Sequence, residues 1–233
     1  NITTGDVDGD GIDEIIVGTI SKNRKEPALL GIFKRDGTPV AMTETEHSDK
    51  RYSVTVASGD IDGDWIEEVA VGYCTKGGDD EDDEEDDVDR TGLGHEVHKD
   101  NDDSRGGHAI VKIYKCVGQQ LIDTGLVLNP YEKEGYRSAP NIALGDVDGD
   151  GVPELITAPG PDPSAPARIK VFKIDTKDGM GRWKIKSQPT YLLVTFDKKK
   201  GRKEGYGANI AAGDLNGDGK AEIIVGPGPD PKN

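Results

Sequence analysis

The chain has few of the residues that build large cores: of its 233 residues, 33% are hydrophobic, 5% are aromatic and two are cysteine. So few apolar side chains cannot cover one large core, and they favour several small buried units repeated along the chain. No run of about eighteen apolar residues occurs, so we expect no membrane insertion.

Basic residues are also scarce, with 29 lysines and arginines against 45 aspartates and glutamates and a formal net charge of −16. This balance argues against nucleic acid as a partner, because phosphate binding needs a basic face. The opening Asn1-Ile2-Thr3 is not a signal peptide, so we expect a mature, processed or trimmed chain. The same tripeptide fits the N-glycosylation acceptor pattern, which alone does not establish glycosylation.

Glycine is abundant, with 32 residues, and it is concentrated in a phrase that occurs four times. The first copy reads TGDVDGDGIDEIIVG, and the copies occupy residues 4–18, 58–72, 144–158 and 212–226. They follow one another at intervals of 54, 86 and 68 residues. Intervals of this length are typical of propeller blades.

Each copy lies between two short apolar or alternating runs, which predicts a strand, an acidic turn and a second strand. Two further strands are expected at 28–33 and 39–43 in the first repeat, and at 168–174 and 182–186 in the third, joined by Asp-Gly turns. Four antiparallel strands per repeat describe one propeller blade. The sequence therefore predicts an all-β chain, a β-propeller of about three and a half four-stranded blades, at 1–50, 51–134, 135–204 and, in part, 205–233.

The acidic phrase, D-x-D-x-D-G-x-x-E, has the spacing of an all-oxygen cation site. Positions 1, 3, 5 and 9 offer side-chain oxygens, position 7 offers its backbone carbonyl, and glycine at position 6 lets the chain turn back around an ion. Such hard ligands select Ca²⁺ over zinc or copper, so we expect up to four Ca²⁺ ions. The predicted side-chain ligands are Asp6, Asp8, Asp10, Glu14, Asp60, Asp62, Asp64, Glu68, Asp146, Asp148, Asp150, Glu154, Asp214, Asn216, Asp218 and Glu222. The predicted carbonyl ligands are Ile12, Ile66, Val152 and Lys220.

Two other interpretations of this phrase are weaker. Isolated Asp-Gly clusters are usually solvated turns, but four copies in register, each with a carboxylate at position 9, argue against that. An EF-hand needs glutamate at position 12, where this chain has valine or threonine. In the second copy Trp65 replaces a glycine, and if the backbone there needs a positive φ, we expect that site to be the weakest or distorted.

These residues resemble the FG-GAP repeat of integrin-α-type propellers and the related VCBS repeats of bacterial surface proteins. The family pattern places an aromatic-glycine pair before an Ala-x-Gly-Asp strand, as Tyr206-Gly207 precedes Ala212-Gly213-Asp214 here. Ala158-Pro159 and Gly226-Pro227 match the end of its second strand. The resemblance covers nearly all of the chain outside 75–107 and implies a propeller with calcium loops between the first two strands of each blade. Family members serve adhesion, carbohydrate binding and scaffolding, so it does not name a ligand.

The fourth repeat stops after its second predicted strand. Either the chain is part of a longer propeller, or a neighbouring subunit completes the blade by strand addition and so builds an oligomer or fibre. We expect the chain to associate mainly with copies of itself.

Residues 75–107 form an acidic insertion in the second repeat, with Asp or Glu at ten of the eleven positions 79–89. The run favours a solvated loop held open by its own charge; a loose divalent-cation sink or a contact for a basic neighbour is the other interpretation. Cys74 and Cys116 flank it. Two cysteines in an extracellular chain suggest a disulfide, whereas a hairpin would place them at opposite strand ends about 20 Å apart.

No catalytic motif such as G-x-S-x-G, H-E-x-x-H or a phosphate loop occurs. We therefore expect a non-enzymatic, extracellular or cell-surface calcium-binding module with a structural or adhesive role, and carbohydrate or a surface protein as a further partner. The alternative is a fragment of a larger cell-surface carbohydrate-binding protein or of a calcium-stabilised polysaccharide-active enzyme.

Overall fold

The computed structural model describes residues 1–19, 27–45, 54–75, 108–134, 136, 138–161, 167–176, 183–186, 190–193 and 207–228. These residues form antiparallel sheets, and the single short helix among them is the 3-10 turn η1 (Glu132–Glu134). The all-β prediction is therefore confirmed. No helix in the described ranges is long and apolar enough to cross a membrane.

Three sheets have four strands each, and in two of them sequence-adjacent strands pair in order. The first contains β1 (Ile2–Gly5), β2 (Glu14–Gly18), β3 (Leu29–Phe33) and β4 (Pro39–Glu44). The second contains β5 (Thr55–Gly59), β6 (Glu68–Cys74), β7 (Ala109–Val117) and β8 (Gln120–Leu128). The third contains β9 (Asn141–Gly145), β10 (Glu154–Ala158), β11 (Arg168–Phe172) and β14 (Thr190–Leu193), and a fourth sheet pairs β15 (Ala208–Gly213) with β16 (Glu222–Pro227).

The sheets stack face to face, which explains how a chain with few apolar residues builds a core. Each neighbouring pair of sheets encloses its own cluster, around Ile16 and Val71, around Ile113 and Leu155, and around Ile156 and Ile169. Every residue of β6 and of β10 is buried, because each of these strands has a sheet on both sides. The prediction of small repeated buried units matches this arrangement.

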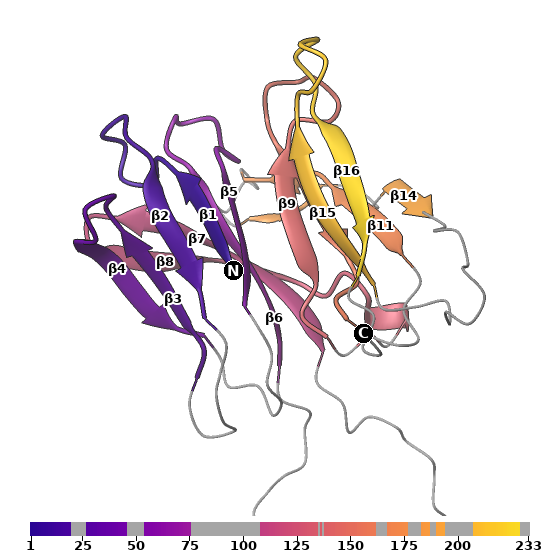
Figure 1. Cartoon of the computed structure of the whole chain (residues 1–233), viewed down its shortest axis with the longest axis horizontal. Helices are drawn as coiled ribbons and strands as arrows, with labels where there is room; N and C mark the ends of the chain where they lie inside the picture. The colour runs from indigo at the N-terminus through magenta and orange to yellow at the C-terminus, as the bar shows by residue number, and fades with distance from the viewer. Residues whose placement is uncertain are drawn as a thin grey trace, which may run out of the picture.

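The first strands of successive sheets lie side by side, in the order β1, β5, β9, β15 (Figure 1). Side-chain hydrogen bonds to backbone carbonyls join these neighbouring sheets. Ser58 Oγ donates to the Thr4 carbonyl at 2.8 Å, Thr55 Oγ1 donates to the Pro140 carbonyl at 2.6 Å, and Asn141 Nδ2 donates to the Ala208 carbonyl at 2.7 Å. As a result, the turns that follow these strands all lie along one edge of the molecule, the upper edge in Figure 1.

The third repeat departs from the strands expected there. The predicted strand 168–174 is interrupted at Lys173, after which β12 (Ile174–Asp175) pairs with β13 (Lys184–Ile185) in a separate two-stranded sheet. The fourth strand of the third sheet is β14, not the segment 182–186.

Both cysteines are free thiols. The register pairs Cys74 with Ala109 at one end of β7, whereas Cys116 pairs with Leu121 near the other end. The strand argument against a disulfide therefore holds. Thr75 and His108 close the neck of the insertion, with Thr75 N donating to the His108 carbonyl at 2.9 Å; residues 76–107 and Tyr206 lie outside the described residues.

Candidate metal centres

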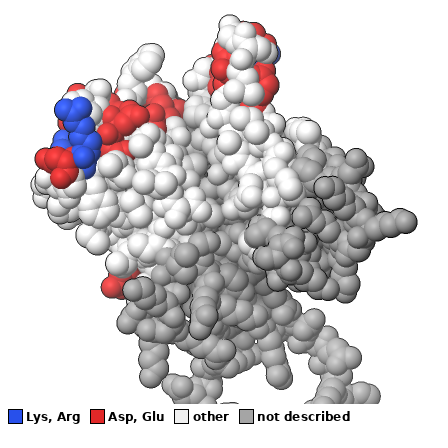
Figure 2. Space-filling model, viewed as in Figure 1, with Lys and Arg blue, Asp and Glu red and all other residues white. Residues whose placement is uncertain are grey.

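Four acidic loops of the same form connect the first and second strands of the sheets. We call them loop 1 (6–14), loop 2 (60–68), loop 3 (146–154) and loop 4 (214–222), and number their positions from 1 to 9. Most of the Asp and Glu atoms visible in Figure 2 lie along the edge that these loops form. The sixteen side chains predicted as ligands are thus gathered into four separate centres on that edge.

The aspartate at position 1 folds each loop around its own carboxylate. In loop 1, Asp6 Oδ1 accepts N–H from Gly9 at 2.8 Å and from Asp10 at 3.1 Å, and Oδ2 accepts N–H from Gly11 at 2.9 Å. The same three bonds recur at Asp60, Asp146 and Asp214. A side chain that binds local backbone N–H groups stabilises a tight turn, so position 1 fixes the shape of the loop.

Positions 5 and 9 use one oxygen for the backbone and turn the other toward the centre of the loop. In loop 1, Asp10 Oδ1 accepts N–H from Ile12 at 3.0 Å, and Glu14 Oε2 accepts N–H from Val7 at 3.3 Å. The equivalent bonds are present in the other three loops. The N–H of position 7 is therefore hydrogen-bonded in each loop. It stays a prediction that the carbonyl oxygens of this position also bind an ion; the residues are Ile12, Ile66, Val152 and Lys220.

The remaining oxygens converge on a common centre. In loops 1 to 3, three carboxylates each place one oxygen within 4.8 Å of the others; they are Asp6, Asp8 and Asp10, then Asp60, Asp62 and Glu68, then Asp146, Asp148 and Glu154. Asp62 Oδ1 is buried and has no hydrogen-bond partner in the part of the chain that the structure describes. An all-oxygen set with an unsatisfied buried acceptor fits a hard cation such as Ca²⁺.

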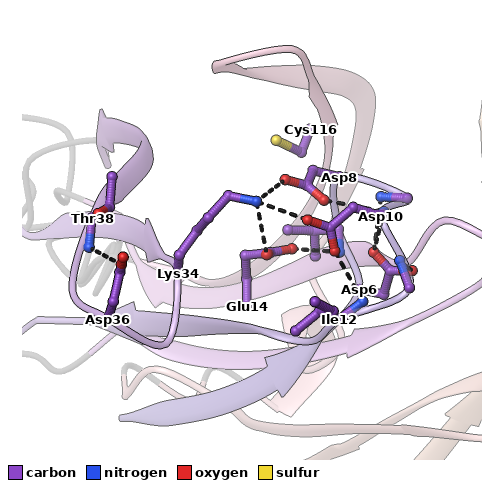
Figure 3. A network of polar contacts seen from close by, with 12 residues as sticks. Asp6, Asp8, Asp10, Ile12, Glu14, Lys34, Asp36, Thr38 and Cys116 are labelled. Atoms are coloured by element: carbon purple, nitrogen blue, oxygen red, sulfur yellow. Dashed lines mark hydrogen bonds and ion pairs between the residues drawn. The ribbon is translucent and has the colours of Figure 1, made fainter.

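A lysine that the sequence did not single out enters each of these three centres. Lys34 Nζ lies 3.1 Å from Asp8 Oδ2, 2.8 Å from Asp10 Oδ2 and 4.0 Å from Glu14 Oε1 (Figure 3). Lys115 Nζ lies 2.5 Å from Asp62, 3.1 Å from Asp64 and 3.1 Å from Glu68. Lys173 pairs with Asp148 and lies 2.9 Å from Asp150 and 3.5 Å from Glu154.

Burial makes negative charge costly at position 9 of loops 1 to 3. It raises the pKa of Glu68 to about 7, and it also raises the pKa of Glu14 and of Glu154 above the ordinary glutamate value. Hydrogen bonds to Asp10 and Asp8 raise the pKa of Lys34, and hydrogen bonds to Asp148 and Asp150 raise that of Lys173. Each centre therefore favours a cation among its carboxylates.

Loop 4 has the same backbone hydrogen bonds, but an amide replaces the carboxylate at position 3. Asn216 stands at position 3, and its Nδ2 donates to Asp218 Oδ2 at 3.2 Å and to Glu222 Oε1 at 2.8 Å. Among the described residues no lysine or arginine forms an ion pair with this loop. A neutral amide thus faces the carboxylates that an ammonium group faces in loops 1 to 3.

Trp65, in loop 2, has the left-handed backbone that the sequence suggested. Its φ is 69°, close to the 82°, 86° and 85° of the glycines at position 6 of the other loops, and its side chain is 88% exposed. Trp65 N still donates to Asp60 Oδ2 at 3.0 Å, so the hydrogen bonds of loop 2 are not distorted. Whether its ion affinity is lowest stays a prediction.

Adjacent loops are joined through their backbones. Glu67 N in loop 2 donates to the Asp6 carbonyl of loop 1 at 2.8 Å, and Ala221 N in loop 4 donates to the Asp146 carbonyl of loop 3 at 2.7 Å. Position 8 of loop 3 is Pro153, which has no N–H to donate toward loop 2. The loops are thus bonded as two pairs.

The fold and these loops define an all-β protein of repeated antiparallel sheets, each with an acidic turn between its first two strands. Residues 206–229 match the family model described as "FG-GAP repeat". The chain therefore contains an FG-GAP repeat at these residues, which confirms that part of the resemblance stated from the sequence; the calcium-binding propeller that the resemblance implies stays a prediction. No curated protein sequence matches the chain.

Solved structures of similar fold include three rhamnogalacturonan lyases. They are the lyase YesW (21% identity, TM-score 0.55, 97% of this chain), the Bacillus licheniformis lyase PL11 (19%, 0.55, 96%) and the exotype lyase YesX (21%, 0.55, 97%). This chain spans 39%, 39% and 38% of those chains, respectively. At such identities the likeness concerns the fold alone.

Proposed function

We propose that the chain is a calcium-binding β-propeller segment of an extracellular protein, in which Ca²⁺ in the acidic loops holds the edge of each blade. The observation that carries this proposal is the repeated form of the loops: the carboxylates at positions 5 and 9 bond the backbone with one oxygen, and in loops 1 to 3 three carboxylates place oxygens around a shared centre. Positions 1, 3, 5 and 9 would hold the ion, which supplies a divalent charge to neutralise them.

The arrangement of the sheets supports the propeller interpretation. The four-stranded sheets stack face to face with their first strands side by side, as blades do around an axis. The FG-GAP match in the fourth repeat is consistent with it. Each sheet is then one blade, and each loop lies between the first and second strands of its blade.

We propose a structural and adhesive role for this segment, with no catalytic residues in the loops. Their carboxylates are committed to backbone N–H groups and to the shared centres, which leaves none of them free to move a proton to or from a substrate. Self-association and binding to carbohydrate or to a surface protein are the expected modes of partnership.

Calorimetric titration of the chelator-treated chain with Ca²⁺ tests the metal proposal. We expect up to four ions to bind and the melting temperature to rise, because an ion that binds the folded chain stabilises it. Asp148→Ala, which removes the side-chain oxygens of position 3 from loop 3, should lose one ion, whereas Asp36→Ala, which changes an exposed turn outside the loops, should keep them all. Absence of binding heat together with an unchanged melting temperature in chelator would refute the proposal.

A second candidate is a polysaccharide-active protein, favoured by the likeness to three rhamnogalacturonan lyases over 96–97% of this chain. Incubation with rhamnogalacturonan, followed by the ultraviolet absorbance of unsaturated sugar ends, tests it. Cleavage that disappears when a carboxylate outside the four loops is replaced would favour an enzyme. Binding without cleavage would favour the adhesive role instead.

A further inference from the structure

The lysines of loops 1 to 3 occupy one equivalent place in the fold. Each follows an aromatic residue on the third strand of its sheet, and that aromatic residue pairs with the residue after position 9 of the loop. The pairs are Phe33 with Ile15, Tyr114 with Val69, and Phe172 with Leu155. Three independent strands thus deliver an ammonium group to the same point of three loops, which a chance surface contact would not do.

The ammonium groups lie against the oxygens that an ion would need. Lys115 Nζ is 2.5 Å from Asp62, 3.1 Å from Asp64 and 3.1 Å from Glu68, which are positions 3, 5 and 9 of loop 2. Calcium binds such oxygens at about 2.3–2.6 Å. An ion held by these carboxylates would therefore lie within a few ångströms of the ammonium nitrogen, where two positive charges repel strongly.

On the basis of the proposed function, we propose that Lys34, Lys115 and Lys173 are tethered counter-cations that hold loops 1 to 3 in the absence of Ca²⁺ and leave them when Ca²⁺ binds. Each of these lysines stabilises the ion-free loop and competes with the ion. The three loops consequently bind Ca²⁺ by exchange, whereas loop 4, where Asn216 faces the carboxylates, has no described lysine to release.

This exchange sets the affinity of the loops. Removing the lysine leaves the carboxylates unpaired, so the ion-free chain becomes less stable. The ion no longer displaces a cation, so its affinity rises; we expect about tenfold or more, which corresponds to about 1.4 kcal/mol. A lysine that merely packed against the loop would change stability without raising affinity.

Loop 2 offers a direct optical readout of the exchange. Lys115 Nζ lies 5.7 Å from the centroid of the Trp183 ring, and the chain has two tryptophans, so Trp65→Phe leaves Trp183 as the reporter. In this background Ca²⁺ should change the fluorescence of Trp183 as the ammonium group leaves. Adding Lys115→Met should abolish that change, although calorimetry still detects Ca²⁺.

The test compares Lys115→Met with Lys112→Met, which removes a lysine of the same strand that pairs with Asp123 away from the loops. Lys115→Met should bind Ca²⁺ more tightly and melt at a lower temperature in chelator, whereas Lys112→Met should leave Ca²⁺ affinity unchanged. If Lys115→Met does not fold, Lys34→Met, at a more exposed lysine, replaces it.

The outcomes separate this proposal from the proposed function. If the parent chain binds no Ca²⁺, the proposed function fails and the exchange fails with it. If the parent chain binds Ca²⁺ but Lys115→Met binds it equally or more weakly, or if Trp183 fluorescence does not respond to the ion, the exchange alone is overturned.

Discussion

A glycine precedes each acidic loop, and at Gly145 it allows the neighbouring sheet to approach closely; the same substitution at two equivalent positions tests this. A Cβ atom at Gly145 would lie 2.7 Å from the Cβ of Ala212 and 2.9 Å from the Cβ of Ala221. At Gly213, the same position in the next repeat, a Cβ atom would meet nothing within 4 Å. We therefore compare Gly145→Ala with Gly213→Ala.

The structure sets the expected magnitudes. Both partners of Gly145 are alanines, whose Cβ atoms are fixed to the backbone, so the clash can be relieved only by moving β15 or loop 4. Overpacking that forces backbone shifts costs about 1–3 kcal/mol, and we expect about 2 kcal/mol for Gly145→Ala. Gly213→Ala meets open space, and alanine lowers the entropy of the unfolded chain, so we expect no loss and a gain of up to about 1 kcal/mol.

Thermal unfolding in saturating Ca²⁺ measures both variants. For a chain of this size about 1 kcal/mol corresponds to about 2–4 °C, so Gly145→Ala should lower the melting temperature by about 4–8 °C. Adding Ala212→Gly to Gly145→Ala removes one of the clashing atoms and should restore part of the loss. Equal effects of Gly145→Ala and Gly213→Ala would show that the close contact between these sheets does not require the glycine.

Two further substitutions test loop 2 and the contact of η1 with β11. Trp65→Gly relieves the left-handed backbone at φ 69° and should raise both stability, by about 0.5 kcal/mol, and the Ca²⁺ affinity of loop 2, whereas Trp65→Ala should not; denaturant unfolding and calorimetry measure these effects. Burial opposes ionisation of Glu134, but hydrogen bonds to Lys170 and Arg168 outweigh it and lower the pKa of this carboxyl. Glu134→Gln should therefore cost about 1–3 kcal/mol at pH 7. Because the native pKa is depressed, this stabilisation is present above the unfolded value and is lost as pH falls through the native one, so unfolding curves of the two chains should converge in acid and not in alkali.

The acidic loops could be predicted from the sequence because everything that shapes them is local. Position 1 binds the N–H groups of positions 4, 5 and 6, and position 5 binds that of position 7, so nine consecutive residues specify the turn. The positive φ of Trp65 follows from the same local alignment with three glycines. Apolar runs on either side were sufficient to place the first two strands of each sheet and to predict the all-β fold, whereas β14, the fourth strand of the third sheet, was not predicted.

The lysines could not be predicted in this way, because they reach the loops from another strand. Lys34 is twenty-four residues from Asp10, and Lys115 is fifty-one residues from Asp64. The position of each lysine depends on the register between the second and third strands of its sheet. Because the segment between these strands can have any length, the register cannot be read from the sequence. The recurring aromatic-lysine pairs at Phe33-Lys34, Tyr114-Lys115 and Phe172-Lys173 are a signal that becomes visible only when the strands are aligned.

Backbone hydrogen bonds couple neighbouring acidic loops in two pairs. Asp6 and Asp146 hold their own loops through both carboxylate oxygens and accept an N–H from the next loop through their carbonyls. One backbone hydrogen bond therefore couples the position of loop 2 to that of loop 1, and another couples loop 4 to loop 3. Pro153 interrupts this series, and its ring packs instead at the place where a Cβ of Gly59 would lie, 3.3 Å away. The middle junction thus depends on apolar packing, whereas each of the two outer junctions links one acidic loop directly to the next through a backbone hydrogen bond.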